Sequence, residues 1–215
     1  MAEQTIRVFL ADDHAMVREG LAALLVKSPG VEIVGQCGDG LKVVSMVQQT
    51  RPDVVLLDIS MPGLNGLDIC RELIRKGSKT AVLMLTMHNE EQFVASALER
   101  GASGYLLKDS AGEQLSEAVR RVARGELYLG PGIPRSALKK MGRQGEDPYN
   151  DLTTREREVL QLIAEGRTNR EISEQLQLSV KTVDTHRTRM MRKLNIHDQT
   201  TLVKFALRKG IVSLL

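Results

Sequence analysis

Several apolar runs in the first half of the chain end in polar residues whose types could carry out phosphoryl chemistry. Asp58 directly follows the run Val54–Leu57, which is typical of a short buried strand. Its carboxylate could equally cap the turn that follows, as Asp often does. Other apolar runs end at Asp12 and Asp13, at Thr86 and at Lys108. Seen singly, each of these residues has an ordinary explanation as a helix cap or a strand residue.

The elements that must position these residues alternate regularly along the chain. Apolar strand-like runs are separated by segments in which apolar residues recur at helical spacing. This alternation predicts an α/β domain, a flavodoxin-like doubly wound five-stranded parallel sheet with helices on both faces. We expect the strand order 2-1-3-4-5, which opens a crevice at the carboxyl ends of strands 1 and 3. The strands are expected at 6–11, 31–37, 54–57, 81–86 and 104–107, and the helices at 16–26, 41–49, 66–75, 90–100 and 112–124.

This topology brings the polar residues to one edge of the sheet. Three carboxylates that converge there would repel one another and raise each other's pKa values unless a cation is present. Mg²⁺ prefers oxygen ligands and keeps several waters, so it suits such a cluster and leaves a position for a phosphoryl oxygen. Lys108 and Thr86 could then bind the oxygens of a phosphoryl group placed on Asp58.

These motifs together resemble the receiver domains of bacterial two-component response regulators. The resemblance covers about residues 6–124. It rests on Asp12-Asp13, on Asp58 followed by Met61-Pro62-Gly63-Leu64-Asn65-Gly66, on Leu85-Thr86, and on Gly101-Ala102 leading to Tyr105-Leu106-Leu107-Lys108. One departure is that Asp109 follows the lysine where many receivers have proline.

The resemblance implies a role for each matching residue. Asp58 would accept a phosphoryl group from a sensor histidine kinase, and Thr86 and Tyr105 would form a switch pair. Lys108 would bind the phosphoryl group. The implied Mg²⁺ ligands are Asp13, Asp58 and the backbone carbonyl of Ser60, with Asp12 acting through water.

The distribution of charge divides the chain into an acidic part and a basic part. Residues 1–130 carry 14 Lys and Arg against 17 Asp and Glu, a net charge of −3, whereas residues 131–215 carry 16 against 10, a net charge of +6. A small basic module suits a polyanion partner, although a basic solvated face is also common without one. With no Trp, three Tyr and three Phe, the chain offers little aromatic surface for stacking single-stranded bases.

Other features predict where the protein resides. Cys37 and Cys70 have apolar neighbours and no metal-ligand spacing, so we expect core residues in a reducing compartment. No signal peptide and no membrane-spanning run is apparent. We therefore expect a cytoplasmic protein without a membrane partner.

A linker is expected between the two parts. The helical pattern stops at Gly125, and the run Gly130-Pro131-Gly132-Ile133-Pro134 cannot extend a helix. A short helical piece at 135–141 and a mobile stretch at 142–151 are expected to follow. The resulting domains are 1–124, a linker at 125–150, and 151–215.

The second domain is expected to be a small all-α module of four helices. Thr153 and Glu156 have capping-box spacing and begin a helix that stops at Gly166. A short helix, a tight turn and a long cationic helix follow, which predicts a helix-turn-helix at about 168–194. On the long helix the expected buried seam consists of Val183, His186, Met190 and Leu194.

The opposite face of the long helix is the candidate DNA-binding surface. Residues near its N-terminus would reach base edges in the major groove of double-stranded DNA, and its arginines and lysines would reach phosphates. The alternative is an ordinary solvated face. The candidate DNA-binding residues are Lys181, Thr182, Asp184, Thr185, Arg187, Thr188, Arg189, Arg192 and Lys193.

Residues 150–215 resemble the LuxR-type DNA-binding domain. The matching residues are Leu152-Thr153, Arg155-Glu156, Glu158-Val159-Leu160, Ala164-Glu165-Gly166, Asn169, Glu171-Ile172, Thr182-Val183-Asp184, His186 and Met191-Arg192-Lys193-Leu194. A receiver joined to such a domain is typical of the NarL/FixJ class of response regulators. In this class the final helix commonly mediates dimerisation, which here indicates Thr200, Leu202, Val203 and Ala206. An acid at Asp184, where lysine is frequent, can accept from cytosine N4 and indicates a different target sequence.

The leading hypothesis is a transcription factor that is controlled by phosphorylation, interacts with the transcription machinery and forms a homodimer when phosphorylated or bound to DNA. A phosphatase with an aspartate nucleophile is the enzymatic alternative. Such enzymes usually carry a second Asp two residues after the nucleophile, where this chain has Ser60. A pseudo-receiver that dimerises constitutively is a third possibility, but its unused carboxylates would repel one another without benefit.

Overall fold

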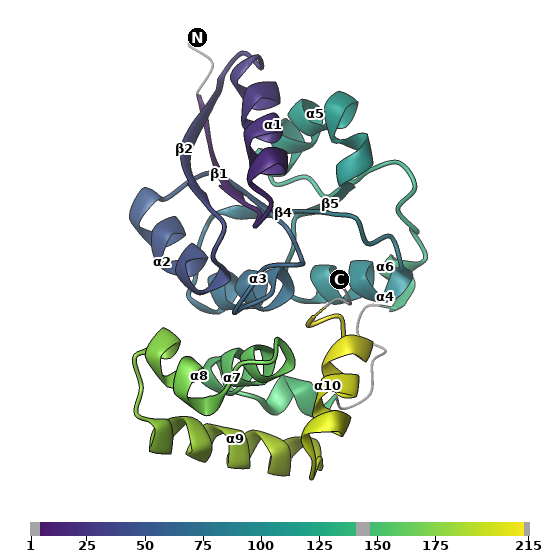
Figure 1. Cartoon of the computed structure of the whole chain (residues 1–215). Helices are drawn as coiled ribbons and strands as arrows, with labels where there is room; N and C mark the ends of the chain where they lie inside the picture. Colours follow the sequence, from purple (N-terminus) through teal and green to yellow (C-terminus); the bar gives the residue numbers. More distant parts are fainter. Residues whose placement is uncertain (1–4, 141–146, 213–215) are drawn as a thin grey trace. The chain divides into compact units, whose positions relative to one another are not determined.

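The computed structural model of the chain describes residues 5–140 and 147–212, which form two compact units (Figure 1). The first is an α/β unit that contains all elements up to Lys140, and the second is a helical unit that begins at Pro148. In the described ranges, no helix combines the length and the apolar character needed to cross a membrane.

The α/β unit is built on a parallel sheet of six strands in the order β2-β1-β3-β4-β5-β6. The predicted order 2-1-3-4-5 is confirmed, but the predicted count of five strands was one too low. The extra strand forms where the amide of Tyr128 donates to the carbonyl of Ser103 at 3.1 Å and that of Gly130 to Tyr105 at 2.9 Å. The strands are β1 (Ile6–Ala11), β2 (Val31–Cys37), β3 (Val54–Leu57), β4 (Ala81–Thr86), β5 (Gly104–Leu107) and β6 (Tyr128–Leu129).

Helices cover both faces of this sheet. In Figure 1, α1 and α5 lie on one face, and α2, α3 and α4 lie on the other. Side chains alternate between the faces of a strand. Leu10, Leu56 and Leu85 accordingly join the buried cluster beneath α1 and α5. The helices are α1 (Ala15–Val26), α2 (Gly40–Thr50), α3 (Gly66–Arg75), α4 (Glu91–Glu99) and α5 (Ala111–Ala123).

Part of the expected linker is structured and belongs to the α/β unit. Beyond β6, the side chain of Ile133 is buried, and a short helix α6 (Ala137–Lys140) packs near α4 with Ala137 fully buried. This helix falls within the short helical piece expected at 135–141. Residue 141, the last of the expected piece, lies outside the described residues. Of the mobile stretch expected at 142–151, residues 142–146 also lie outside them, and η2 (Pro148–Asp151) is a 3-10 turn.

Within residues 147–212, the helical unit contains four α-helices, and their ends follow sequence signals. Thr153 and Thr168 each form a capping box with the glutamate three residues later. The first helix ends before Gly166, which adopts a φ of +84° that favours glycine. The helices are α7 (Thr154–Ala164), α8 (Asn169–Leu176), α9 (Val180–Leu194) and α10 (Gln199–Arg208), with α8 and α9 forming the predicted helix-turn-helix.

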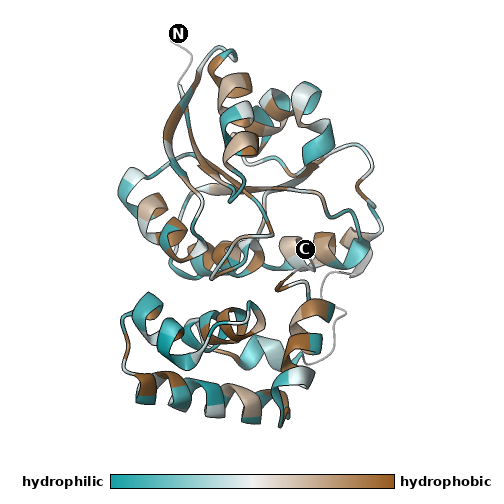
Figure 2. Cartoon of the chain, viewed as in Figure 1, coloured by the Kyte–Doolittle hydropathy of each residue, from teal (hydrophilic) through white to brown (hydrophobic). Residues whose placement is uncertain are grey.

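The long helix α9 has one buried side and one solvent-facing side. Figure 2 shows hydrophobic and hydrophilic residues alternating along it. Val183, Met190 and Leu194 are buried, as predicted. The prediction was wrong for His186, which is only partly buried because its position lies at the edge of the apolar stripe.

Candidate functional site

Asp58 lies at the carboxyl end of β3 and faces the side chain of Lys108. Its amide donates to the carbonyl of Ala11 at 2.9 Å, which anchors it to the neighbouring strand β1. Lys108 Nζ lies 2.7 Å from Asp58 Oδ2 and 2.8 Å from Asp12 Oδ2. Both carboxylates are buried, with side-chain exposures of 3% and 4%. The carboxyl ends of β1, β3 and β5 therefore meet at one site.

Burial and charge act against each other in this site. Burial raises the pKa of Asp58 above its ordinary value, and the charge and hydrogen bond of Lys108 offset part of that effect. Burial acts to lower the pKa of Lys108, but Asp58 and Asp12 outweigh it and raise the pKa. The lysine therefore carries its charge and neutralises one of the neighbouring carboxylates.

The donor atoms around Asp58 fit a divalent metal ion. One ligand atom from each of Asp12, Asp13, His14 and Asp58 lies within 4.8 Å of the others. Three carboxylates and Lys108 together carry a net charge of about −2, which a divalent cation balances. Oxygen donors of this kind are those that Mg²⁺ prefers. Arg18 donates from Nη1 to the carbonyl of Asp12 at 2.6 Å and so holds the loop that carries these acids.

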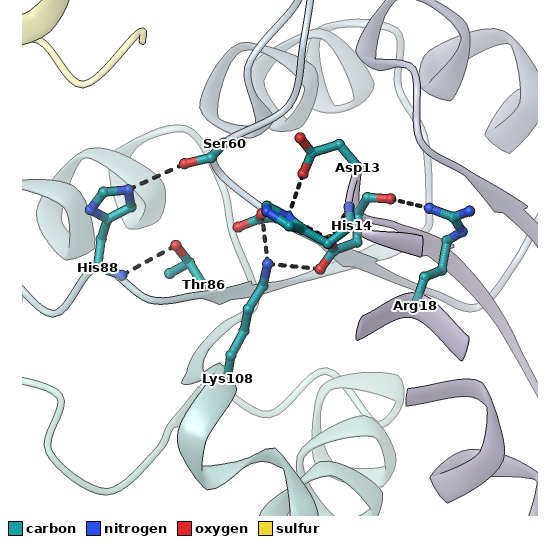
Figure 3. A network of polar contacts seen from close by, with 9 residues as sticks. Asp13, His14, Arg18, Ser60, Thr86, His88 and Lys108 are labelled. Carbon is teal, nitrogen blue, oxygen red and sulfur yellow. Dashed lines mark hydrogen bonds and ion pairs between the residues drawn. The ribbon is translucent and has the colours of Figure 1, made fainter. Parts of the chain in front are cut away.

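Thr86 and Tyr105 both contact His88, a residue that sequence reasoning missed. The Thr86 hydroxyl accepts from the His88 amide at 3.3 Å, and the buried Tyr105 hydroxyl donates to the His88 carbonyl at 2.9 Å. The His88 ring nitrogen Nε2 lies 3.3 Å from the hydroxyl of Ser60 (Figure 3). The available signal was its place two residues after Thr86, in the loop at the carboxyl end of β4. The Ser60 backbone carbonyl as a metal ligand stays a prediction.

The candidate DNA-binding residues lie on the solvent-facing side of α9. Ser179 caps the helix by accepting from the Thr182 amide at 3.0 Å, and Thr182 itself is partly buried. Arg187 is also partly buried, whereas the remaining candidates have high residue exposure. The exposed candidates are Lys181, Asp184, Thr185, Thr188, Arg189, Arg192 and Lys193.

Two of the cations on α9 bind other parts of the helical unit. Lys193 Nζ lies 2.7 Å from Glu156 Oε2 on α7 and donates to the carbonyl of Asp151 at 2.9 Å. Arg187 donates to the side chain of Asn169 at 3.4 Å and to that of Gln199 at 3.3 Å. These contacts join α9 to its neighbours, so both residues have a structural role in addition to the predicted one.

The residues expected to mediate dimerisation divide into two groups on α10. Leu202 and Ala206 are fully buried, because they face the packed side of the helix. In this conformation they are core residues of the helical unit, and a dimerisation role for any of the four residues stays a prediction. Thr200 is exposed and Val203 is partly exposed.

Two family models match the chain. Residues 8–120 match the response regulator receiver domain, and residues 150–206 match the bacterial regulatory proteins of the luxR family. Similar proteins cover nearly the whole chain. The transcriptional regulatory protein LiaR of Bacillus subtilis is 39% identical over 97% of this chain and 100% of its own length.

Solved structures of similar proteins include two of the response regulator RcsB. RcsB of Salmonella enterica serovar Typhimurium, bound to promoter P1flhDC in the presence of the phosphomimetic BeF3−, has a TM-score of 0.58. A structure of two RcsB dimers bound to two parallel DNAs has a TM-score of 0.59. Each is 26% identical to this chain and covers 94% of it and 98% of its own length.

The fold, the acidic site at the end of β3 and the helix-turn-helix agree with these matches, and the two family models account for most of the chain. The chain belongs to the NarL/FixJ class of two-component response regulators, which join a receiver domain to a LuxR-type DNA-binding domain.

Proposed function

We propose that Asp58 accepts a phosphoryl group from a sensor histidine kinase and that this modification controls DNA binding by the helical unit. The observation that carries the proposal is the position of Asp58, which lies at the carboxyl end of β3 within 2.7 Å of Lys108 and inside a cluster of metal donors. The proposed phosphoacceptor domain spans residues 1–124 and the proposed DNA-binding domain spans residues 151–215. The structured residues up to Lys140 belong to the same compact unit as the first domain.

In the proposed reaction a carboxylate oxygen of Asp58 attacks the phosphorus of a phosphohistidine. A P–O bond forms, the P–N bond breaks, and the imidazole leaves with the electron pair. Lys108 would bind an oxygen of the transferred group and Thr86 would donate a hydrogen bond to another. Mg²⁺, held by Asp12, Asp13, Asp58 and the carbonyl of Ser60, would supply positive charge for the phosphoryl oxygens.

The Thr86 hydroxyl offers a route from the phosphoryl group to the rest of the unit. It accepts from the His88 amide, and the His88 carbonyl accepts from the Tyr105 hydroxyl. If Thr86 turns towards a phosphoryl oxygen, it gives up the contact with the His88 amide, and the loop after β4 can rearrange. The loop after β4 would then have two arrangements, and phosphorylation would shift the equilibrium between them. Such a shift carries the effect of a local charge change to a distant surface.

We further propose that α9 reads double-stranded DNA. Lys181, Asp184, Thr185 and Thr188 would approach base edges, and Arg189 and Arg192 would contact phosphates. The RcsB structures on DNA support DNA binding by similarity. The RcsB dimers likewise support a homodimer, for which Thr200 and Val203 are our candidate contacts because neither is buried. As a cytoplasmic regulator the protein would then act on the transcription machinery.

Ser60 favours a regulator over an aspartate-nucleophile phosphatase, because such a phosphatase usually has a second Asp at this position.

The test is labelling of the full chain by acetyl phosphate with Mg²⁺. Asp58→Asn should abolish the phosphorylated species seen in a phosphate-affinity gel. Asp109→Asn, a change of the same type at an exposed acid next to Lys108, should leave it intact. Labelling of the Asp58→Asn variant at the level of the unchanged chain would overturn the assignment of the phosphoacceptor.

A further inference from the structure

His14 directly follows the two acids of the metal cluster, and its imidazole faces them. The backbone amide of His14 donates to Asp12 Oδ1 at 2.9 Å, which fixes the loop before α1. Its ring nitrogen Nδ1 lies 2.8 Å from Asp13 Oδ1 (Figure 3). The same nitrogen lies 3.5 Å from Asp12 Oδ1. The cluster therefore offers one nitrogen donor beside its carboxylate oxygens.

The spacing of these atoms is that of neighbouring ligands on one metal ion. Two adjacent ligands of an octahedral ion with bonds of about 2.1 Å are roughly 3 Å apart, and opposite ligands are about 4.2 Å apart. The separation of 2.8 Å between His14 Nδ1 and Asp13 Oδ1 matches adjacent positions. All four donor atoms lie within 4.8 Å of one another, slightly more than the distance between opposite ligands. Small side-chain movements would bring all four to one ion.

We propose that His14 is a ligand of this metal site and gives it a preference for a divalent transition metal, such as Mn²⁺, over Mg²⁺. This inference rests on the metal site of the proposed function. Mg²⁺ is a hard cation that takes oxygen ligands, whereas imidazole suits transition metals, whose affinity for nitrogen-containing sites rises from Mn²⁺ to Cu²⁺. A site of three carboxylates and one imidazole therefore binds Mn²⁺ more tightly than the carboxylates alone would.

The alternative is that His14 only forms an ion pair with Asp13. The imidazole side chain is 64% exposed and that of Asp13 is 33% exposed, so such a pair would contribute little to stability. The same exposure makes His14 a suitable position for substitution, because His14→Gln removes the imidazole without opening a cavity in the core. His197→Gln, at an exposed histidine of the helical unit, is the matched control.

The experiment measures Mn²⁺ bound to the full chain by electron spin-echo spectroscopy, which detects nitrogen coordinated to the ion. We expect imidazole nitrogen modulation in the unchanged chain and in His197→Gln, and its loss in His14→Gln. Loss of even an outer-shell partner weakens metal sites by about tenfold or more, so His14→Gln should lower Mn²⁺ affinity by at least about tenfold. Its Mg²⁺ affinity should change by less than about twofold.

Two results would overturn the inference. The first is a Mn²⁺ complex of the unchanged chain without nitrogen modulation, and the second is equal Mn²⁺ affinity in His14→Gln and the unchanged chain. If either occurs while Mg²⁺ still supports labelling of Asp58, only the role of His14 fails. If the unchanged chain binds neither ion, the metal site of the proposed function fails with it.

Discussion

A Cβ atom on Gly66 would lie 1.9 Å from the backbone carbonyl oxygen of Asp58. The first residue of α3 therefore packs directly against the backbone of the proposed phosphoacceptor. The amide of Gly66 also donates to the carbonyl of Ile59 at 2.9 Å, which closes the loop that leads out of β3. The close approach explains why this position needs glycine, although its φ is not in the left-handed region.

Gly66→Ala is expected to destabilise the α/β unit and to slow phosphorylation of Asp58. The backbone must shift to admit the methyl group, and overpacking of this kind costs about 1–3 kcal/mol or more. Gly20→Ala is the control, because Gly20 is an exposed position within α1 and nothing lies within 4 Å of its added Cβ. That change should stabilise the helix by about 0.5–1 kcal/mol. Chemical denaturation and acetyl phosphate labelling measure both effects, and equal behaviour of the two variants would contradict the packing argument.

Lys193→Met is expected to destabilise the helical unit near neutral pH. The change leaves Glu156, which is buried, without the lysine, and removal of one partner of a buried polar pair costs about 1–3 kcal/mol. Lys181→Met, at an exposed lysine of the same helix, should have little effect. Hydrogen exchange of the α9 amides in the full chain measures the difference, and similar protection in the two variants would refute the structural role of Lys193.

The effect of Lys193→Met should also depend on pH. Burial acts to raise the pKa of Glu156, but the hydrogen bonds from Lys193 and Thr153 and the lysine's charge outweigh it, and the pKa lies below the ordinary value of 4.5. Because the folded unit holds the proton less tightly than the unfolded chain, the pair stabilises it above about pH 4.5 and loses this contribution as the pH falls through the lowered pKa. The difference in unfolding free energy between the variant and the unchanged chain should therefore shrink in acid. A constant difference from pH 7 to pH 3 would rule out this linkage.

Arg189→Gln and Arg192→Gln should weaken binding to specific and unrelated DNA alike. A phosphate contact carries no sequence information, and its loss should reduce the slope of log affinity against log salt concentration by about 1. Lys42→Gln removes the same charge from an exposed position on α2 and should leave the slope unchanged. Fluorescence anisotropy at several salt concentrations measures the slopes. A loss restricted to one DNA sequence would instead make these arginines base-reading residues.

Cys70 is expected to resist thiol reagents until the α/β unit unfolds. Its side chain is fully buried, and burial raises the pKa of the thiol to about 12. At pH 8 only about one thiol in ten thousand would then be ionised, and the thiolate is the reactive form. Rates of reaction with Ellman's reagent in a Cys37→Ser background, with and without denaturant, measure the protection. Rapid reaction of the folded chain would show that the α/β unit opens readily around α3.

Local patterns along the chain were enough to predict the α/β sheet and its acidic edge. Apolar runs with helical segments between them are the direct signature of parallel strands and crossovers, so all five expected strands appear at the expected residues. The meeting of Asp12, Asp58 and Lys108 followed from topology, because the carboxyl ends of parallel strands share one edge. The capping boxes of α7 and α8 are equally local.

Contacts between residues far apart in the chain decided the rest. The two residues of β6 are too few to show the alternation of apolar and polar residues that marks a strand. Only their pairing with β5 makes them a strand. Lys193 and Arg189 are both cations on α9, and the sequence pattern does not show that Lys193 pairs with Glu156 of α7. Only the packing of α7 against α9 reveals this difference. His88 belongs to the site because its loop brings it there, and contacts with the distant Tyr105 and Ser60 hold that loop. Sequence patterns thus determined the elements and their chemistry, and packing determined which side chains meet.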